Sequence, residues 1–201
     1  RGRKPADLNL TECRIVDFFR GRIVDGAVVS LYRGYIVGVG IKADHLAAIN
    51  TRSLGGRYLC PGLVDAHVHI ESSLLAPVEF ARLVAPLGTT TVVADPHEIA
   101  NVLGHDGINW MLRASEGIPL DVYMMVPSCV PATGFDTAGA ALYASDLARF
   151  ARDDRVLGLG EVMNYPGVLA ADPTVMDKVS LFWEASKAID GHAPGLSGRD
   201  L

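Results

Sequence analysis

Short apolar runs separated by turn residues dominate the first sixty residues. Four runs are rich in β-branched and aromatic residues, which favour strands: residues 8–10, 15–18, 27–31 and 35–39. The residue pairs between them are typical of turns: Arg20 with Gly21, Asp25 with Gly26, and Arg33 with Gly34. The last pair joins two apolar runs directly, as in a tight β-hairpin. Residues 1–60 are therefore predicted to form a small flanking domain, part of a β-sandwich-like unit.

From residue 61 onward the pattern alternates between strand-like and helix-like segments. Residues 63–70 form an apolar run entered through Pro61 and Gly62, which predicts a buried strand that begins at a turn. Further strands are predicted over residues 89–94, 121–126, 156–160 and 189–191. Apolar residues at helical spacing lie between them, as in the stripe formed by Phe80, Leu83, Val84 and Leu87.

The ends of these helices also carry recognisable residues. Gly88 follows the stripe at 80–87 and is suited to close that helix. Ser145 is predicted to cap the helix that carries Leu147, and Asp172 to cap the helix that begins at Pro173. Each helix therefore has a predicted start or stop next to a strand.

The spacing of the strand ends indicates a repeated βα unit. The strands end near His69, Asp95, Pro127, Glu161 and His192, each 26 to 34 residues after the previous one, close to the roughly 30 residues of one unit. Such units build either a doubly wound sheet or a (β/α)₈ barrel. Ligand-type residues at four of the five strand ends favour the barrel.

Only about five βα units are present, and a complete barrel needs eight units and about 250 residues. The sequence thus predicts an α/β chain with a partial (β/α)₈ TIM-type barrel, preceded by the small β domain. Residues 61–201 are expected to be the N-terminal portion of such a barrel in a longer protein.

Composition narrows the class of protein. The chain is 49% hydrophobic and 20% charged, with a mean hydropathy of +0.24 and a net charge of −5, which is typical of soluble globular proteins. No basic excess favours nucleic acid, and no run reaches the roughly 18 to 20 apolar residues of a membrane span. Three scattered cysteines, Cys13, Cys60 and Cys129, form no disulfide framework. We therefore expect a cytoplasmic protein without a membrane or nucleic-acid partner.

Two histidines in the central strand suggest a metal site. His67 and His69 are two residues apart, so their side chains project to the same side of a strand. Two imidazoles at fixed separation suit a divalent metal. Glu161 and His192 stand at corresponding strand ends, and the Glu161 carboxylate could bridge two metals. The alternatives are that Glu161 caps the following turn and that His192 is an ordinary loop histidine.

Polar residues beside these strand ends have two readings. Asp95, His97 and Glu98 could contact the substrate or orient metal-bound imidazoles, or Asp95 could simply cap a turn. Glu71 directly follows the histidine pair and could face the mouth of a pocket. The residues alone do not decide between these roles.

Several motifs resemble those of a known family. Residues 61–69, Pro-Gly-Leu-Val-Asp-Ala-His-Val-His, resemble the first-strand signature of the amidohydrolase superfamily. Further segments, in this order, resemble the bacterial adenine deaminase family within it: residues 69–73, 95–99, 127–131, 160–163 and 190–196. The first motif is widely shared, whereas the later ones are more selective. The resemblance covers nearly the whole chain.

The resemblance implies a binuclear metal site that deaminates adenine to hypoxanthine, releasing ammonia. By position, His67 and His69 would hold one metal, Glu161 would bridge, and His192 would hold the second. The metals of the family are manganese or iron. The remaining candidates are His97 and Glu98 for proton transfer, and Glu71 and Asp95 for contacts to the purine. The resemblance is compatible with a homodimer.

The resemblance also defines what is missing. The family's metal-binding histidine of strand 6 and aspartate of strand 8 would lie beyond Leu201, so the isolated chain is expected to be inactive or very weakly active. One rival is a hydrolase of cyclic amides, such as a dihydroorotase or hydantoinase, which commonly has a carboxylated lysine where Glu161 stands. Deacetylases of N-acetyl sugars, some of which use a glutamate, and an inactive truncated barrel are the others.

Overall fold

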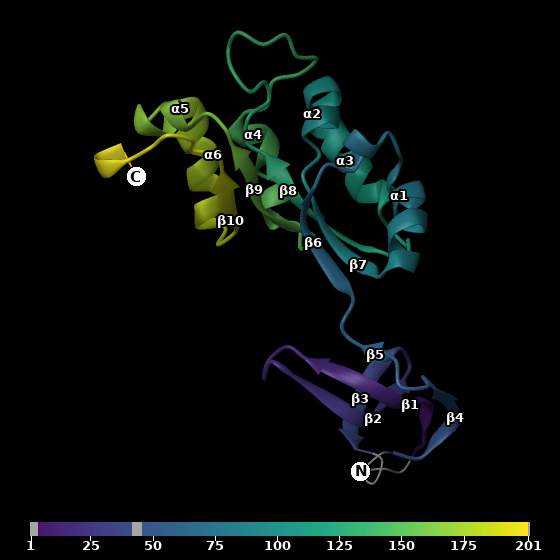
Figure 1. Cartoon of the computed structure of the whole chain (residues 1–201). Helices are drawn as coiled ribbons and strands as arrows, with labels where there is room; N and C mark the ends of the chain where they lie inside the picture. The colour runs from purple at the N-terminus through teal and green to yellow at the C-terminus, as the bar shows by residue number, and fades with distance from the viewer. Residues whose placement is uncertain (1–3, 42–45, 201) are drawn as a thin grey trace. The chain divides into compact units, whose positions relative to one another are not determined.

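The chain folds into two compact units, Arg1–Pro61 and Gly62–Leu201. The computed structural model describes residues 4–41 and 46–200 (Figure 1). Within these ranges no helix combines the length and apolar character needed to cross a membrane. The two units are described separately below.

The first unit is a five-stranded mixed sheet. Its strands are β1 (Ala6–Asp17), β2 (Arg22–Tyr32), β3 (Tyr35–Ile41), β4 (Ala48–Ser53) and β5 (Tyr58–Leu59). The order is β3-β2-β1-β4, with β5 also paired to β1. Strands β1, β2 and β3 are antiparallel neighbours, whereas β4 and β5 run parallel to β1. A small buried cluster of Cys13, Ala27 and Val29 forms its core.

Two turn predictions in this unit had different outcomes. Arg33 and Gly34 do form the tight hairpin between β2 and β3, in which Tyr32 faces Tyr35 and both turn residues have positive φ. The turn predicted at Asp25 and Gly26 is wrong, because both residues lie inside β2. Gly26 has a φ of +64° and stands where the register with β1 shifts. It therefore makes a β-bulge and not a chain reversal.

The second unit contains a parallel sheet of five strands. These are β6 (Leu63–Val68), β7 (Thr89–Ala94), β8 (Asp121–Pro127), β9 (Val156–Val162) and β10 (Ala188–Gly191), in the order β10-β9-β8-β7-β6. Each neighbouring pair is parallel. Because consecutive strands pair in sequence order, the sheet is one continuous part of a barrel wall, as Figure 1 shows. The predicted α/β partial barrel is thereby confirmed.

Helices connect the strands of this sheet. The α-helices are α1 (Pro77–Val84), α2 (His97–Leu103), α3 (His105–Ala114), α4 (Ala144–Leu147), α5 (Tyr165–Leu169) and α6 (Pro173–Glu184). Short 3₁₀ turns lie at Glu71–Ser73, Ala85–Leu87, Phe150–Arg152 and Gly198–Asp200. Fully buried side chains from strands and helices, among them Val92, Ile108, Leu159 and Phe182, meet in one core cluster. This packing fixes the strand ends relative to one another.

One burial prediction is wrong. The run at residues 63–70 does form the strand β6, but Leu63 and Val64 are 58% and 63% exposed. The reason is that β6 is an edge strand, paired within the described residues only with β7. Ile70, just past the strand, is fully buried.

The helix ends show which capping predictions hold. Gly88 follows the 3₁₀ turn after α1 with a φ of 107°, as its helix-closing role requires. The Asp172 Oδ1 atom accepts a hydrogen bond from the Thr174 amide at 2.8 Å, which confirms it as the cap of α6. The predicted cap Ser145 is wrong, because α4 begins one residue earlier and its cap position is Tyr143. The Tyr143 amide donates instead to Asp146 Oδ2 at 2.8 Å.

Candidate metal centre

The candidate ligands lie at the carboxyl ends of the parallel strands. His67 belongs to β6 and His69 follows it directly, while Glu161 is near the end of β9. His192 follows β10. Because parallel strands bring their carboxyl ends to the same edge of a sheet, residues far apart in sequence meet here.

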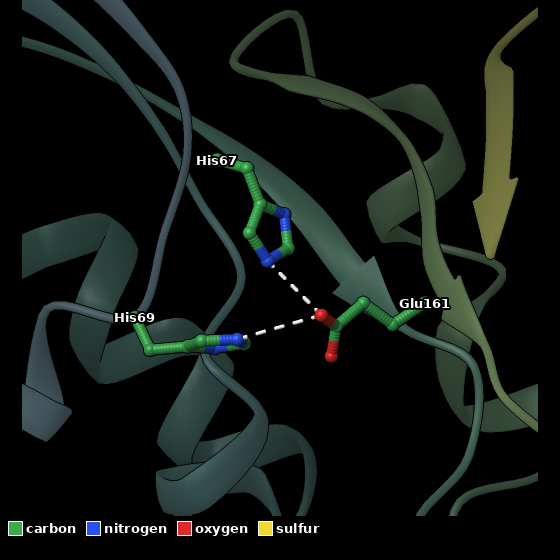
Figure 2. Close-up of side chains that lie close together, drawn as sticks. All are labelled: His67, His69 and Glu161. Atoms are coloured by element: carbon green, nitrogen blue, oxygen red, sulfur yellow. Dashed lines mark ion pairs between the residues drawn. The ribbon is translucent and has the colours of Figure 1, made fainter. Parts of the chain in front are cut away.

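One carboxylate oxygen of Glu161 lies close to the rings of three histidines. Glu161 Oε1 lies 3.0 Å from His67 Nε2, 3.5 Å from His69 Nε2 and 3.3 Å from His192 Nε2. Figure 2 shows His67 and His69 both pointing toward this carboxylate. The structure therefore brings together the four residues that the sequence suggested as metal ligands.

The other oxygen of Glu161 faces a buried pair. Glu161 Oε2 lies 3.3 Å from His97 Nδ1, and that nitrogen lies 2.8 Å from Asp95 Oδ1. The ligand-type atoms thus form two groups, one with His67 and His69 and one with Asp95 and His97, which share Glu161. Within each group these atoms all lie within 4.8 Å of one another.

A hydrogen-bond contact to the backbone orients the ring of His69. His69 Nδ1 lies 2.7 Å from the carbonyl oxygen of Asp95, so its other nitrogen, Nε2, is the one that faces Glu161. Metal-binding imidazoles usually have a partner of this kind on the ring nitrogen that does not bind metal.

The backbone of Glu161 is held in an uncommon conformation. Its φ of 44° lies in the left-handed region, which is unfavourable for a residue with a β-carbon. Its amide donates to Asp190 Oδ1 at 2.8 Å, and its carbonyl accepts from Ser128 Oγ at 2.9 Å. Sequence reasoning missed both partners, although Ser128 directly follows a strand and Asp190 stands two residues before His192.

The surroundings lower the pKa of Glu161 and raise the pKa of His69. Burial by itself raises the pKa of Glu161, but the hydrogen bond from His192 and the neighbouring histidines outweigh it and lower that pKa. Burial by itself lowers the pKa of His69, but the Asp95 carbonyl together with Glu98 and Glu161 raises it. Each group therefore favours its charged form, as expected of a carboxylate and imidazole held in contact.

Two further carboxylates, Glu71 and Glu98, lie beside this cluster. Glu98 Oε2 is 3.6 Å from His69 Nδ1, and Glu98 accepts a hydrogen bond from Ser72 Oγ. Glu71 Oε1 accepts from the Ile99 amide at 3.3 Å. Burial raises the pKa of Glu71; burial also acts to raise that of Glu98, but the Ser72 hydroxyl and other contacts lower it.

The residues present fit a divalent metal. Imidazole nitrogens and carboxylate oxygens are the donors that first-row divalent metals prefer. Asp95 Oδ2 and His97 Nε2 are buried without a hydrogen-bond partner in the described residues. Buried polar atoms normally have partners, so these atoms belong to a site that a charged group completes.

Comparisons of the sequence with known proteins found a family and close relatives. Residues 58–200 match the Amidohydrolase family. The chain is 54% identical over its whole length to an adenine deaminase of Nitratidesulfovibrio vulgaris, and 50% identical to one of Kosmotoga olearia. It spans only 34% of the length of each of these curated relatives.

The fold is also similar to that of solved structures. One is an atrazine chlorohydrolase from Arthrobacter aurescens, determined as a complex with zinc, with a TM-score of 0.56 and 16% identity. The match covers 76% of this chain and 46% of that protein. At this identity the likeness establishes the fold alone.

Proposed function

Because this chain belongs to the amidohydrolase family, we propose that the whole protein hydrolyses adenine to hypoxanthine and ammonia. The observation that carries the proposal is the identity of 54% and 50% to two adenine deaminases along the entire chain. In the reaction, the oxygen of water forms a bond to C6 of the purine. The bond from C6 to the amino nitrogen breaks, and the nitrogen leaves as ammonia.

In this proposal, His67, His69, Glu161 and His192 hold a pair of divalent ions, manganese in the first place and iron as the alternative. A divalent ion held by these residues would lower the pKa of water toward neutrality and so would supply a nucleophile. The contacts of 3.0 to 3.5 Å from the three imidazoles to one oxygen of Glu161 support a shared role for this carboxylate. Its lowered pKa keeps it ionised.

Proton transfer falls to Glu98 and His97. The pKa of Glu98 is lowered, so the group is an ionised acceptor at neutral pH, and it lies within 3.6 Å of His69. Glu98 takes a proton from the attacking water and passes it to the departing amino group, which leaves as ammonia, so that Glu98 ends the step ionised again. His97 Nδ1 lies 3.3 Å from Glu161 Oε2 and 2.8 Å from Asp95 Oδ1, and this position between two carboxylates supports its part in the exchange.

Glu71 and Asp95 recognise the purine in different ways. Burial raises the pKa of Glu71, which makes the protonated carboxyl group, able to donate a hydrogen bond to a ring nitrogen, more accessible than it is in water. Asp95 is fully buried, so it acts on the substrate through the neighbouring His97. Both roles follow the positions that the family resemblance suggested.

The test is an assay of the whole protein loaded with Mn²⁺. Adenine is supplied, hypoxanthine is measured by chromatography and ammonia by a coupled assay, and cyclic amides and N-acetyl sugars serve as competing substrates. We expect equimolar hypoxanthine and ammonia, with activity lost on chelation and restored by Mn²⁺. Turnover of a cyclic amide or an N-acetyl sugar in place of adenine would reject the proposal.

The proposal also includes a cytoplasmic location and allows a homodimer. A purine is the expected partner, with no nucleic acid or membrane. Sedimentation of the whole protein determines whether it is a dimer.

A further inference from the structure

A buried lysine on α6 is connected to the candidate metal centre by hydrogen bonds through Ser128. Lys178 lies on α6 between the buried residues Val175 and Phe182 and is only 7% exposed. Lysines are rarely buried to this extent, because removing the ammonium group from water is costly. Burial accordingly lowers the pKa of Lys178. Among residues 4–41 and 46–200, no carboxylate forms a salt bridge with it, so its burial needs another explanation.

The Lys178 ammonium group binds the chain at the end of a neighbouring strand. Its Nζ atom donates to the carbonyl oxygen of Ser128 at 2.7 Å, from α6 across to the residue that follows β8. Ser128 is itself buried. An ammonium group on a peptide carbonyl makes a charge-assisted hydrogen bond, which is stronger than a neutral one. Lys178 therefore fixes the position of Ser128.

Ser128 in turn forms hydrogen bonds with the backbone of Gly160 and Glu161. Its amide donates to the Gly160 carbonyl at 3.1 Å, and its hydroxyl donates to the Glu161 carbonyl at 2.9 Å. Glu161 has a φ of 44°, and a strained backbone of this kind persists only where its surroundings hold it. A hydrogen-bonded chain thus runs from Lys178 through Ser128 to Glu161.

We propose that Lys178 is a positioning residue which, through Ser128, holds the Glu161 carboxylate in place for metal binding. The inference rests on the proposed function, because it takes Glu161 as a metal ligand. Lys178 itself touches neither metal nor substrate. Contacts that orient metal ligands are typically worth 10- to 100-fold in metal affinity.

The chain offers a matched control in Lys187. Its Nζ also donates to backbone carbonyls, those of Asp153 and Val156 at 2.9 and 2.6 Å. These carbonyls lie at the start of β9, whereas Glu161 lies near its end. Lys187 therefore makes the same kind of bond at the start of β9, whereas Lys178 makes it just past the end of the neighbouring strand β8.

The experiment measures the Mn²⁺ affinity of the whole protein by competition with a chelator, for the variants Lys178→Met and Lys187→Met. We expect Lys178→Met to bind Mn²⁺ about tenfold more weakly, and Lys187→Met to bind it like the wild type. The direction is informative, because removal of a positive charge by itself would tighten the binding of a cation. Unchanged or tighter binding by Lys178→Met, or an equal loss in Lys187→Met, would overturn the inference.

A second variant keeps the test decisive if Lys178→Met does not fold. Ser128→Ala removes the hydroxyl bond to Glu161 but leaves the carbonyl that Lys178 binds, so we expect a similar loss of affinity. Lys178→Arg, which keeps the charge and the donor, should recover part of it. Normal Mn²⁺ binding by Ser128→Ala refutes the inference alone, whereas a wild-type protein that binds no metal refutes the proposed function and the inference together.

Discussion

The two sheets of this chain use their strand ends differently. In the first unit β1, β2 and β3 alternate in direction, so the ends of neighbouring strands lie at opposite edges. In the second unit all neighbouring pairs are parallel, and His67, Glu161 and His192 meet at one edge although 125 residues separate the first from the last. Strand direction, and not the supply of polar residues, therefore decides where a site can be assembled.

The largest expected effect comes from removing a candidate metal ligand at the carboxyl ends of the strands in the second sheet. His67→Gln removes one imidazole from Glu161 Oε1. On the proposed function, loss of a metal ligand would remove the activated water, so kcat/KM for adenine should fall by at least about three orders of magnitude, or about 4 kcal/mol. Metal content and activity of the whole protein are measured together.

His105→Gln is the matched control for this change. His105 lies on α3, where it is exposed and pairs with Asp106 at 3.0 Å, away from the strand-end cluster. Its metal content and activity should equal those of the wild type. A His67→Gln protein that keeps its full metal content would show that the strand edge is not the metal site.

A somewhat smaller effect separates the packed core of the second sheet from the surface of the first. Phe182 is fully buried in the core of the second unit, whereas Phe19, in the turn after β1, is fully exposed. Phe182→Ala should lower the free energy of unfolding by about 3 to 4 kcal/mol, and Phe19→Ala should change it by less than about 0.5 kcal/mol. Urea unfolding measures both, and similar values would contradict the difference in packing.

Two glycines sharpen the comparison further. A β-carbon at Gly160 would lie 2.6 Å from Asp95 Oδ2 and 2.7 Å from Met125 Cβ, whereas one at Gly26 would meet nothing within 4 Å. Gly160→Ala should therefore cost about 2 kcal/mol by overpacking and weaken Mn²⁺ binding. Gly26→Ala should cost about 1 kcal/mol, because of its left-handed backbone, without affecting metal. Equal Mn²⁺ affinities in the two variants would contradict this.

The smallest expected effect is a pH dependence confined to the strand-end site. Metal binding requires the neutral imidazole of His69, and the pKa of this group is raised. As the pH falls through that pKa, protonation should weaken Mn²⁺ binding by about tenfold per unit. Removing the charge of Glu98 with Glu98→Gln should lower the pKa of His69, so that metal is retained to a lower pH. Affinity that stays constant over roughly pH 5 to 8 would contradict the expectation.

Much of this fold follows from local sequence signals. The strand predicted over residues 89–94 coincides with β7, and the helix cap at Asp172 is where its side chain predicts. The errors have local causes as well. Gly26 has the positive φ of a turn residue but sits in a bulge, and Ser145 suits a cap but lies one residue inside the helix.

Some residues of the candidate site can be predicted from the sequence, and others cannot. His67, His69, Glu161 and His192 are recognisable because each is a ligand-type histidine or glutamate in or directly after a predicted strand. Ser128 and Asp190 carry no such signal, because a serine or aspartate near a strand end usually belongs to a turn. Lys178 carries a weak sequence signal, because it is a charged residue at helical spacing from Val175 and Phe182. These two residues lie on the face of α6 that the fold buries.

The sequence by itself determined the succession of strands and helices and the positions of the ligand-type residues, because periodicity and turn chemistry act over a few neighbouring residues. Only the tertiary structure decided that one oxygen of Glu161 faces three histidines while the other faces His97. It also decided that Glu161 takes a left-handed backbone conformation. These features depend on contacts between strands more than 25 residues apart in the chain, and such contacts exist only once the parallel sheet has formed.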